Sequence, residues 1–310
     1  MADVTAGEAD GAAAPALSRR RLLAAAATGW LSGCTFNPDA DHSGADAPRS
    51  APLQPPPALA WVLSSGGPRG FVHVGVVKAL AEMQLKPDLI VGASVGALVA
   101  VMYASGMPIA ELETLALDLQ PWELAGLAIG GDQWFSGEPL ADLVDHCLRE
   151  RVGQPLLERL PLPAVCAAQR LADGEVVGFN HGRAGLAVQA AGAIVGRFVP
   201  VHIRGQRYAD ADLVMPLPVR LARQFGAGKV LAVDASAYED RAPAGTEKWR
   251  AGDLRKRALT RPDAELADLL LHPDTGYYAG TSRDYREHSI AIGYRTTMAA
   301  RERIVALHRR

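Results

Sequence analysis

The sequence has few of the residues that mark several large classes of protein. It holds only three cysteines among 310 residues. Cys147 and Cys166 lack the paired short spacing of a zinc site, so we expect neither a disulfide framework nor a metal centre, and interpret both as buried apolar side chains. The formal net charge is only −2, and no run of Lys and Arg lies among aromatic residues. A nucleic-acid partner is therefore not expected.

The sequence also lacks a long apolar run near its start. Residues 22–31 are apolar but too short for a permanent transmembrane helix. They follow Arg19-Arg20-Arg21, and a charged segment before a short apolar one is typical of an export signal. Leu31-Ser32-Gly33-Cys34 then resembles a bacterial lipobox, and residues 18–23 resemble a twin-arginine signal.

These features predict a signal sequence over residues 1–33 and a lipidated Cys34 that anchors the chain to a membrane. By resemblance to the sorting rule of bacterial lipoproteins, Thr35 after the cysteine favours the outer membrane, so we expect a lipoprotein of the bacterial cell envelope. A plain cleaved signal, or an Ala-rich tract without this role, is the alternative. Residues 34–58 are rich in Asp, Ser, Ala and Pro, and predict a flexible tether.

What the sequence does contain is a serine between glycines, where an apolar run gives way to a helical pattern. Residues 88–91 read as a strand, Gly92-Ala93-Ser94-Val95-Gly96 as a sharp turn, and residues 97–104 as a helix. This G-x-S-x-G arrangement is that of a nucleophile elbow, which projects the serine hydroxyl from the turn. The backbone N–H of Val95 would then face a developing oxyanion. A tight turn with only a structural role is the alternative.

A second strand, glycine loop and helix comes just before this unit. Residues 60–64 are apolar, Ser65-Gly66-Gly67-Pro68-Arg69-Gly70 form the loop, and residues 71–83 show helical spacing. A dinucleotide site is disfavoured, since Ser65 interrupts the G-x-G-x-x-G pattern. Two neighbouring βα units predict a parallel sheet, with both loops at the carboxyl ends of its strands and facing one pocket.

Together the two motifs resemble the patatin-like phospholipase family. The resemblance implies a three-layer α/β/α sandwich with a mostly parallel sheet, and hydrolysis of lipid acyl esters by a Ser–Asp dyad. It implies Ser94 as nucleophile and backbone N–H groups of Gly66, Gly67 and Val95 as the oxyanion hole. Residues in supporting roles would be Arg69, Gly70, Gly92 and Gly96. No cofactor or metal is implied.

The dyad aspartate is expected downstream, and Tyr208-Ala209-Asp210-Ala211-Asp212 is similar to the family's aspartate block. This similarity implies Asp210 as the proton acceptor. Ala211 and Asp212 depart from the usual glycines, which could displace Asp210 or raise its pKa. The other interpretation is that Asp212 faces solvent and the motif is relaxed.

The remaining elements follow from apolar spacing. We expect a catalytic domain over residues 59–235, and a mobile loop with C-terminal helices on the same domain over residues 236–310. The predicted helices are residues 107–119, 139–151, 263–271 and 285–305, the predicted hairpin is residues 163–179, and the last strand is residues 229–234. Residues 121–138, with Trp122 and Trp134, suit a flap that either contacts lipid or only covers core.

The function predicted is therefore a serine acyl-ester hydrolase of phospholipase A or lysophospholipase type, with a lipid or fatty-acyl ester as substrate. One alternative is a catalytically degenerate lipoprotein that binds lipid or a partner without turnover. Another is a different serine hydrolase with a histidine base, such as His202 or His288. We interpret His73, in the first helix, as a packing residue.

Overall fold

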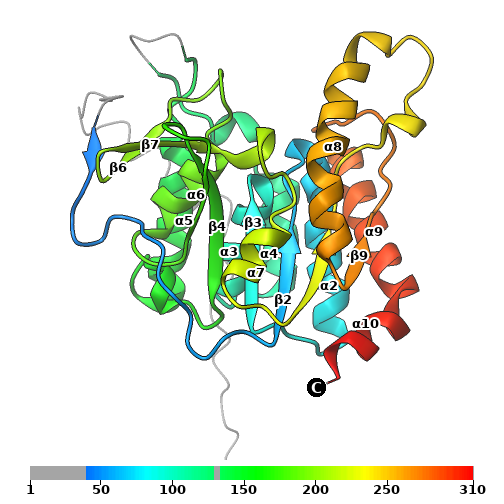
Figure 1. Cartoon of the computed structure of the whole chain (residues 1–310), viewed down its shortest axis with the longest axis horizontal. Helices are drawn as coiled ribbons and strands as arrows, with labels where there is room; N and C mark the ends of the chain where they lie inside the picture. Colours follow the sequence, from blue (N-terminus) through cyan, green and yellow to red (C-terminus); the bar gives the residue numbers. More distant parts are fainter. Residues whose placement is uncertain (1–39, 129–132, 310) are drawn as a thin grey trace, which may run out of the picture.

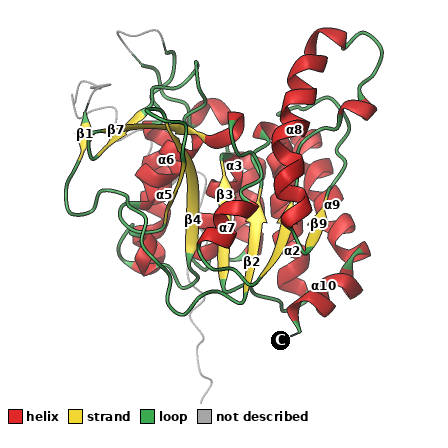
Figure 2. Ribbon diagram, viewed as in Figure 1, coloured by secondary structure: helices red, strands yellow, loops and turns green. Residues whose placement is uncertain are grey.

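A single sheet runs through the molecule, with helices on both of its faces (Figures 1 and 2). The computed structural model describes residues 40–128 and 133–309. The strands are β1 (Asp41–His42), β2 (Leu59–Leu63), β3 (Leu89–Ala93), β4 (Ala164–Arg170), β5 (Val176–Phe179), β6 (Val201–Ile203), β7 (Gln206–Asp210), β8 (Lys229–Val233) and β9 (Leu269–Leu271). The helices are α2 (Phe71–Glu82), α3 (Val95–Ala104), α4 (Ile109–Asp118), α5 (Glu138–Val152), α6 (Ala184–Gly192), α7 (Val219–Gln224), α8 (Arg250–Leu266), α9 (Arg283–Ala299) and α10 (Arg301–His308).

The centre of the sheet is parallel. Its order is β1-β6-β7-β4-β3-β2-β8-β9, and β5 also pairs with β4. Strands β4, β3, β2, β8 and β9 pair in parallel, whereas β4 pairs antiparallel with β5 and β7. Parallel strands are covered on both faces, which is why these segments read as continuous apolar runs.

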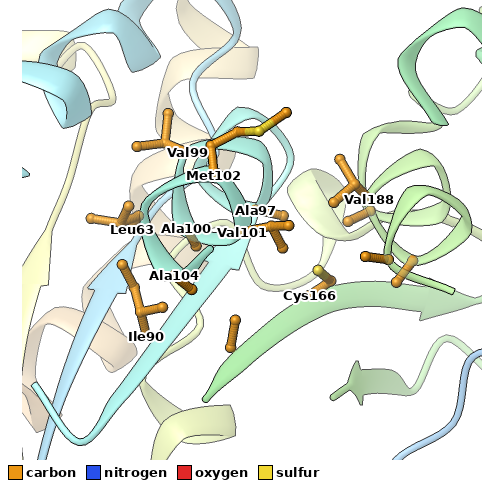
Figure 3. Packing of buried hydrophobic residues seen from close by; sticks show 14 of the residues in the cluster. Leu63, Ile90, Ala97, Val99, Ala100, Val101, Met102, Ala104, Cys166 and Val188 are labelled. Atoms are coloured by element: carbon orange, nitrogen blue, oxygen red, sulfur yellow. The ribbon is translucent and has the colours of Figure 1, made fainter. Parts of the chain in front are cut away.

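Alternate residues of the central strands enter two separate cores. Trp61, Leu63 and Ile90 pack in the larger core beneath α2, α3 and α6, and Ala60 and Val62 pack in the smaller one beneath α7. Figure 3 shows α3 in the larger core, where its Ala97 and Val101 lie between the strands and Val188 of α6. The α/β fold with a mostly parallel sheet between two helical layers is therefore confirmed.

Strand β7 continues the line of β3 along the same side of β4. Ala168 of β4 pairs with Val177 of β5 on one side and Asp210 on the other, and Cys166 pairs with Phe179 of β5 and Gly92 of β3. Both β3 and β7 thus lie opposite β5. Because β7 runs antiparallel to β4, its carboxyl end points at the carboxyl end of β3. The register brings the residues after Ala93 and the last residue of β7 to one point.

The described part of the expected tether lies against the domain. Residues 41–42 form β1 and pair with β6, and Asn180 bonds to both the backbone N–H and the carbonyl of Ala51, each at 2.8 Å. Ala47 is buried. The prediction of a free tether was wrong from residue 40 onward, because this polar segment is held by backbone pairing that leaves no pattern of apolar residues. The signal sequence and Cys34 lie outside the described residues.

The C-terminal quarter also differs from the prediction. Residues 250–266, assigned largely to a mobile loop, form α8, and the predicted helix over 263–271 is the end of α8 followed by strand β9. Pro262 inside α8 and its many charges hid the helical period. Its buried Asp263 accepts hydrogen bonds from the backbone (2.8 Å) and side chain (3.0 Å) of Arg220.

The helix predicted over residues 285–305 is split between α9 and α10 at Ala300. The helices over residues 107–119 and 139–151 and the hairpin are present as α4, α5 and the β4–β5 pair. Within residues 40–128 and 133–309, no helix is both long enough and apolar enough to span a bilayer.

Candidate active site

Ser94 occupies a strained turn between β3 and α3. Its φ of 53° and ψ of −127° lie in a region that residues with a side chain rarely adopt. A Cβ on Gly92 would overlap the Gly96 carbonyl, and a Cβ on Gly96 would overlap the Leu63 carbonyl. The two glycines are therefore required by close backbone approach, which is the geometry of a nucleophile elbow.

The glycine loop lies beside this turn, between β2 and α2. Gly67 has a φ of +52°, and a Cβ on Gly70 would overlap the side chain of Val95. The loop and the elbow are thus in direct contact. His73, fully buried, bonds through Nε2 to the Ser64 carbonyl at 2.9 Å, and burial lowers its pKa to about 4. It is neutral near pH 7 and holds the start of the loop, as its interpretation as a packing residue requires.

Several backbone N–H groups of the loop and the elbow have no acceptor in the described part of the chain, among them those of Gly66, Gly67 and Val95. Val95 is the first residue of α3, where N–H groups have no partner within the helix and the helix dipole is positive. An oxyanion is the ligand that such donors favour.

Asp210 is 2% exposed and its pKa is raised to about 7, chiefly because burial disfavours the charged form. A side-chain hydrogen bond with Ser94 counters part of this rise. The backbone N–H of Asp212 donates to Asp210 Oδ1 at 2.9 Å, and the N–H of Asp210 donates to the Ala193 carbonyl at 2.9 Å. A carboxylate beside a serine hydroxyl, with a pKa near neutrality, suits proton transfer.

Ala211 and Asp212 stand where the family usually has glycines, but they do not displace Asp210, which lies beside Ser94. Neither residue has a positive φ, so the local backbone does not need glycine. The Asp212 carboxylate does not simply face solvent. It accepts hydrogen bonds from the Ser65 hydroxyl and from Lys256 of α8. Lys256 also donates to Ser65 Oγ at 2.8 Å.

Lys256 is the residue near the site that sequence reasoning missed. It lies in a segment that was predicted to be a loop, and no motif surrounds it. Its positive charge lowers the pKa of Asp210, whereas the negative charge of Asp212 raises it. The only signal in the sequence was Asp212 itself. It stands where the family usually has glycine, and a partly buried carboxylate at such a position needs a cation nearby.

Arg69 donates to the carbonyl of Tyr277, in the loop that follows β9. Tyr277 in turn donates its hydroxyl to Asp253 of α8 at 2.6 Å. Arg69 therefore links the glycine loop to the C-terminal region, which is a structural role.

The histidines considered as alternative bases lie elsewhere. His202 is in β6, opposite Arg207, and His288 is exposed on α9. No histidine among the described residues hydrogen-bonds to Ser94. Cys147 and Cys166 are buried, with pKa values raised to about 11 and about 12 by burial. The part of the chain that the structure describes holds no cluster of three or more His, Cys, Asp or Glu side chains suited to a metal.

Comparison with known proteins gives matches over the same region. The model of the patatin-like phospholipase family matches residues 61–223, slightly more than half of the chain. An uncharacterized NTE family protein of Mycobacterium tuberculosis is 31% identical over 201 residues, which cover 62% of this chain and 54% of that protein. The lysophospholipase NTE1 of Coccidioides immitis is 26% identical over 194 residues, covering 61% of this chain and 12% of that protein.

The chain thus spans about half the length of its mycobacterial relatives. Among solved structures, the type III effector protein ExoU matches with a TM-score of 0.47 and 16% identity, over 84% of this chain and 56% of that one. VipD from Legionella pneumophila matches with a TM-score of 0.48 and 14% identity, over 83% of this chain and 70% of that one.

Proposed function

Because the chain belongs to the patatin-like phospholipase family, we propose that it is a serine acyl-ester hydrolase acting on lipids, of phospholipase A or lysophospholipase type. The observation that carries this proposal is the position of Ser94. It stands on a strained elbow at the carboxyl end of β3, beside the buried Asp210, whose pKa it lowers, and next to N–H groups without an acceptor among the described residues. The relatives named lysophospholipase support the choice of lipid esters.

The reaction would proceed through an acyl-enzyme. Asp210 accepts the proton of Ser94 as Oγ attacks the ester carbonyl, and the N–H groups of Gly66, Gly67 and Val95 stabilise the oxyanion. Asp210 then gives its proton to the leaving alcohol. Water then attacks the acyl carbonyl while Asp210 accepts its proton, and Asp210 returns that proton to Ser94 Oγ as the bond to the acyl group breaks and the fatty acid leaves. A single carboxylate thus serves each half-reaction as base and then as acid.

The test is hydrolysis of a short-chain nitrophenyl ester and of defined phospholipids and lysophospholipids. We expect the unmodified chain to release fatty acid and Ser94→Ala to release none above background. Equal rates for the two proteins would support the alternative of a degenerate member that binds lipid without turnover.

We further propose that the chain is a membrane-anchored lipoprotein of the bacterial cell envelope, attached through Cys34. The support is the lipobox-like Leu31-Ser32-Gly33-Cys34 after a short apolar run. Mass spectrometry of the chain from the membrane fraction should find diacylglycerol and an acyl group on an N-terminal Cys34. An unmodified Cys34, or a chain with residues 1–33 intact, would contradict the proposal.

A further inference from the structure

Exposed apolar side chains are concentrated at the edge of the sheet that carries Ser94. Ten large apolar side chains are exposed within the described residues. Leu266 lies at the opposite edge, where α8 ends and β9 begins. The other nine lie in segments that adjoin the candidate active site, and we refer to them as the apolar rim. Single exposed apolar residues are ordinary, but a concentration around one site marks an interaction surface.

The first arc of the rim comes from two parts of the chain that pack together, the loop before α5 and the loop after α6. Trp122, Leu127 and Trp134 are 67%, 75% and 73% exposed, and Ile194 and Val195 complete the arc. The two segments are joined by hydrogen bonds from the N–H groups of residues 134 and 135 to the carbonyl of residue 197, at 3.0 and 3.2 Å. Residue 193, just before the arc, accepts the hydrogen bond from the Asp210 N–H. The first arc therefore begins within two residues of a contact of Asp210.

The second arc lies across Asp210, on the side of α8. Leu213 follows Asp212 directly. Leu254 is exposed on α8, the helix whose Lys256 pairs with Asp212, although two positions from Lys256 it projects from a different face of that helix. Trp249 directly precedes α8. Tyr278 follows Tyr277, whose hydroxyl donates a hydrogen bond to Asp253 of α8. Four more exposed apolar side chains thus lie in segments that adjoin the site from the other direction.

Figure 1 shows the segments that carry the two arcs at the same end of the molecule. The arrowheads of β2 and β3 point upward, and the green segment before α5 and the first turns of α8 stand above them on opposite sides. Ser94 follows the arrowhead of β3. The rim therefore borders the site on two sides.

The chemistry of the rim fits a lipid surface better than a protein. Tryptophan favours the boundary between acyl chains and head groups, and three tryptophans belong to the rim. Lys248 lies 4.4 Å from the ring of Trp249, and Arg197 is exposed beside the first arc. Apolar side chains with cations nearby are the pattern of interfacial membrane binding. A protein bound on both arcs would also cover Ser94, whereas a bilayer would bring acyl esters to it.

We propose that the apolar rim docks the chain on a lipid bilayer, with the two arcs inserted on either side of Ser94. This inference rests on the proposed function, since it explains how a substrate held in a membrane reaches the serine. It is separate from attachment through Cys34, because docking depends on the folded domain alone.

The test measures co-sedimentation with phosphatidylcholine vesicles at low and high salt. The protein is the full chain with Cys34→Ser, which prevents lipidation, and Ser94→Ala, which prevents hydrolysis. In this background we compare the double variant Trp122→Ser/Trp134→Ser with Leu266→Ser, an exposed apolar residue outside the rim. All proteins share residues 22–31, so differences between them report on the domain.

We expect the double variant to bind vesicles about tenfold more weakly than its parent, at either salt concentration, and Leu266→Ser to bind as its parent does. With Ser94 intact, the double variant should hydrolyse a soluble nitrophenyl ester normally and long-chain phospholipid in vesicles slowly. Equal vesicle binding by the two variants would overturn the proposal. So would a dimer of the parent, in the absence of vesicles, that the double variant abolishes, because the rim would then be covered by a second copy.

The outcomes separate this inference from the proposed function. If Ser94→Ala left ester hydrolysis unchanged, the proposed function would fail while vesicle binding could still depend on the rim. If the rim variants changed nothing, docking would fail while the ester assay still held.

Discussion

Ser94 stands on a strained backbone that residues with a side chain rarely adopt, whereas Asp210 stands on a backbone of ordinary conformation. The elbow has a φ of 53° at Ser94 and two glycines that cannot carry a Cβ. Asp210 has a φ of −57° and a ψ of 132°. One half of the site is thus specified by backbone sterics, both inside the turn and against the adjacent strand β2.

The other half depends on contacts that are remote in sequence. Asp210 reaches Ser94 because β7 pairs with β4 in a register that points it at the end of β3. The charges beside it come from Asp212 and from Lys256 on α8. The comparison indicates that the proposed nucleophile, Ser94, tolerates little change in its backbone, while the pKa of Asp210 can be tuned by its neighbours without displacing it.

The largest effect is expected from Ser94→Ala. Because the reaction requires its oxygen, we expect kcat for a nitrophenyl ester to fall by on the order of 10⁴-fold or more. The melting temperature should fall by little or rise, since the φ of residue 94 remains strained but the side chain shrinks. Ser105→Ala, which removes a buried hydroxyl at the end of the same helix, is the control and should keep its activity.

Asp210→Asn should lower activity by about 10²- to 10⁴-fold, because the amide cannot accept the Ser94 proton. It should also raise the melting temperature at pH 8. The pKa of Asp210 is about 7 in the folded chain, against 3.8 as its ordinary value, so stability falls as the pH rises between these values. Above pH 7 the buried, ionised Asp210 carboxylate imposes its full cost on stability, and the neutral amide of asparagine removes that cost. A lower melting temperature at pH 8 than the parent's would contradict this account.

Two single substitutions compare the backbone of the elbow with the backbone beside Asp210. Gly96→Ala would place a Cβ against the Leu63 carbonyl, and we expect a loss of roughly 3 kcal/mol or more in the free energy of unfolding. Ala211→Gly restores a glycine beside Asp210 and should cost about 1 kcal/mol or less, since Ala211 needs no unusual φ. Urea denaturation measures both. Similar losses in the free energy of unfolding would show that the elbow and the segment beside Asp210 do not differ in their steric constraints.

The smallest expected effect is a shift in the midpoint of the pH dependence of activity. The proposed mechanism requires the ionised form of Asp210, so kcat/KM should rise with pH and reach half its maximum near pH 7. Lys256→Met removes a charge that lowers the pKa of Asp210, and should move this midpoint upward by roughly half a unit. Asp212→Asn removes a charge that raises it, and should move the midpoint downward. The double variant should lie between the two.

A merely structural role for Lys256 would lower activity equally at every pH. Full recovery of Lys256→Met at pH 9 is therefore the outcome that distinguishes the electrostatic role. A midpoint that stays in place in both single variants would contradict it.

The difference between the halves also explains what could be predicted. Residues 92–96 and the loop at residues 65–70 each follow an apolar run directly and precede a helical pattern, so glycine spacing and apolar runs were enough to predict strand, turn and helix. Asp210 was found through resemblance, because a single aspartate after a short strand has no local signature.

Lys256 and the path of residues 40–58 could not be predicted. Their partners lie far away in sequence, in Asp212 and in β6, and the segments themselves have no apolar period. Strand β9 was missed for a similar reason, since Leu269-Leu270-Leu271 fits either a helix or a strand and only its pairing with β8 decides.

The central claim is that Asp210 activates Ser94 for nucleophilic attack. Its most direct test is the rate at which a fluorophosphonate probe labels Ser94 at pH 8, with the modified residue identified by peptide mass spectrometry. We predict labelling at Ser94 alone in the unmodified chain, and labelling at least about a hundredfold slower in Asp210→Asn. Equal labelling rates in the two proteins, or modification of a different serine, would contradict the account.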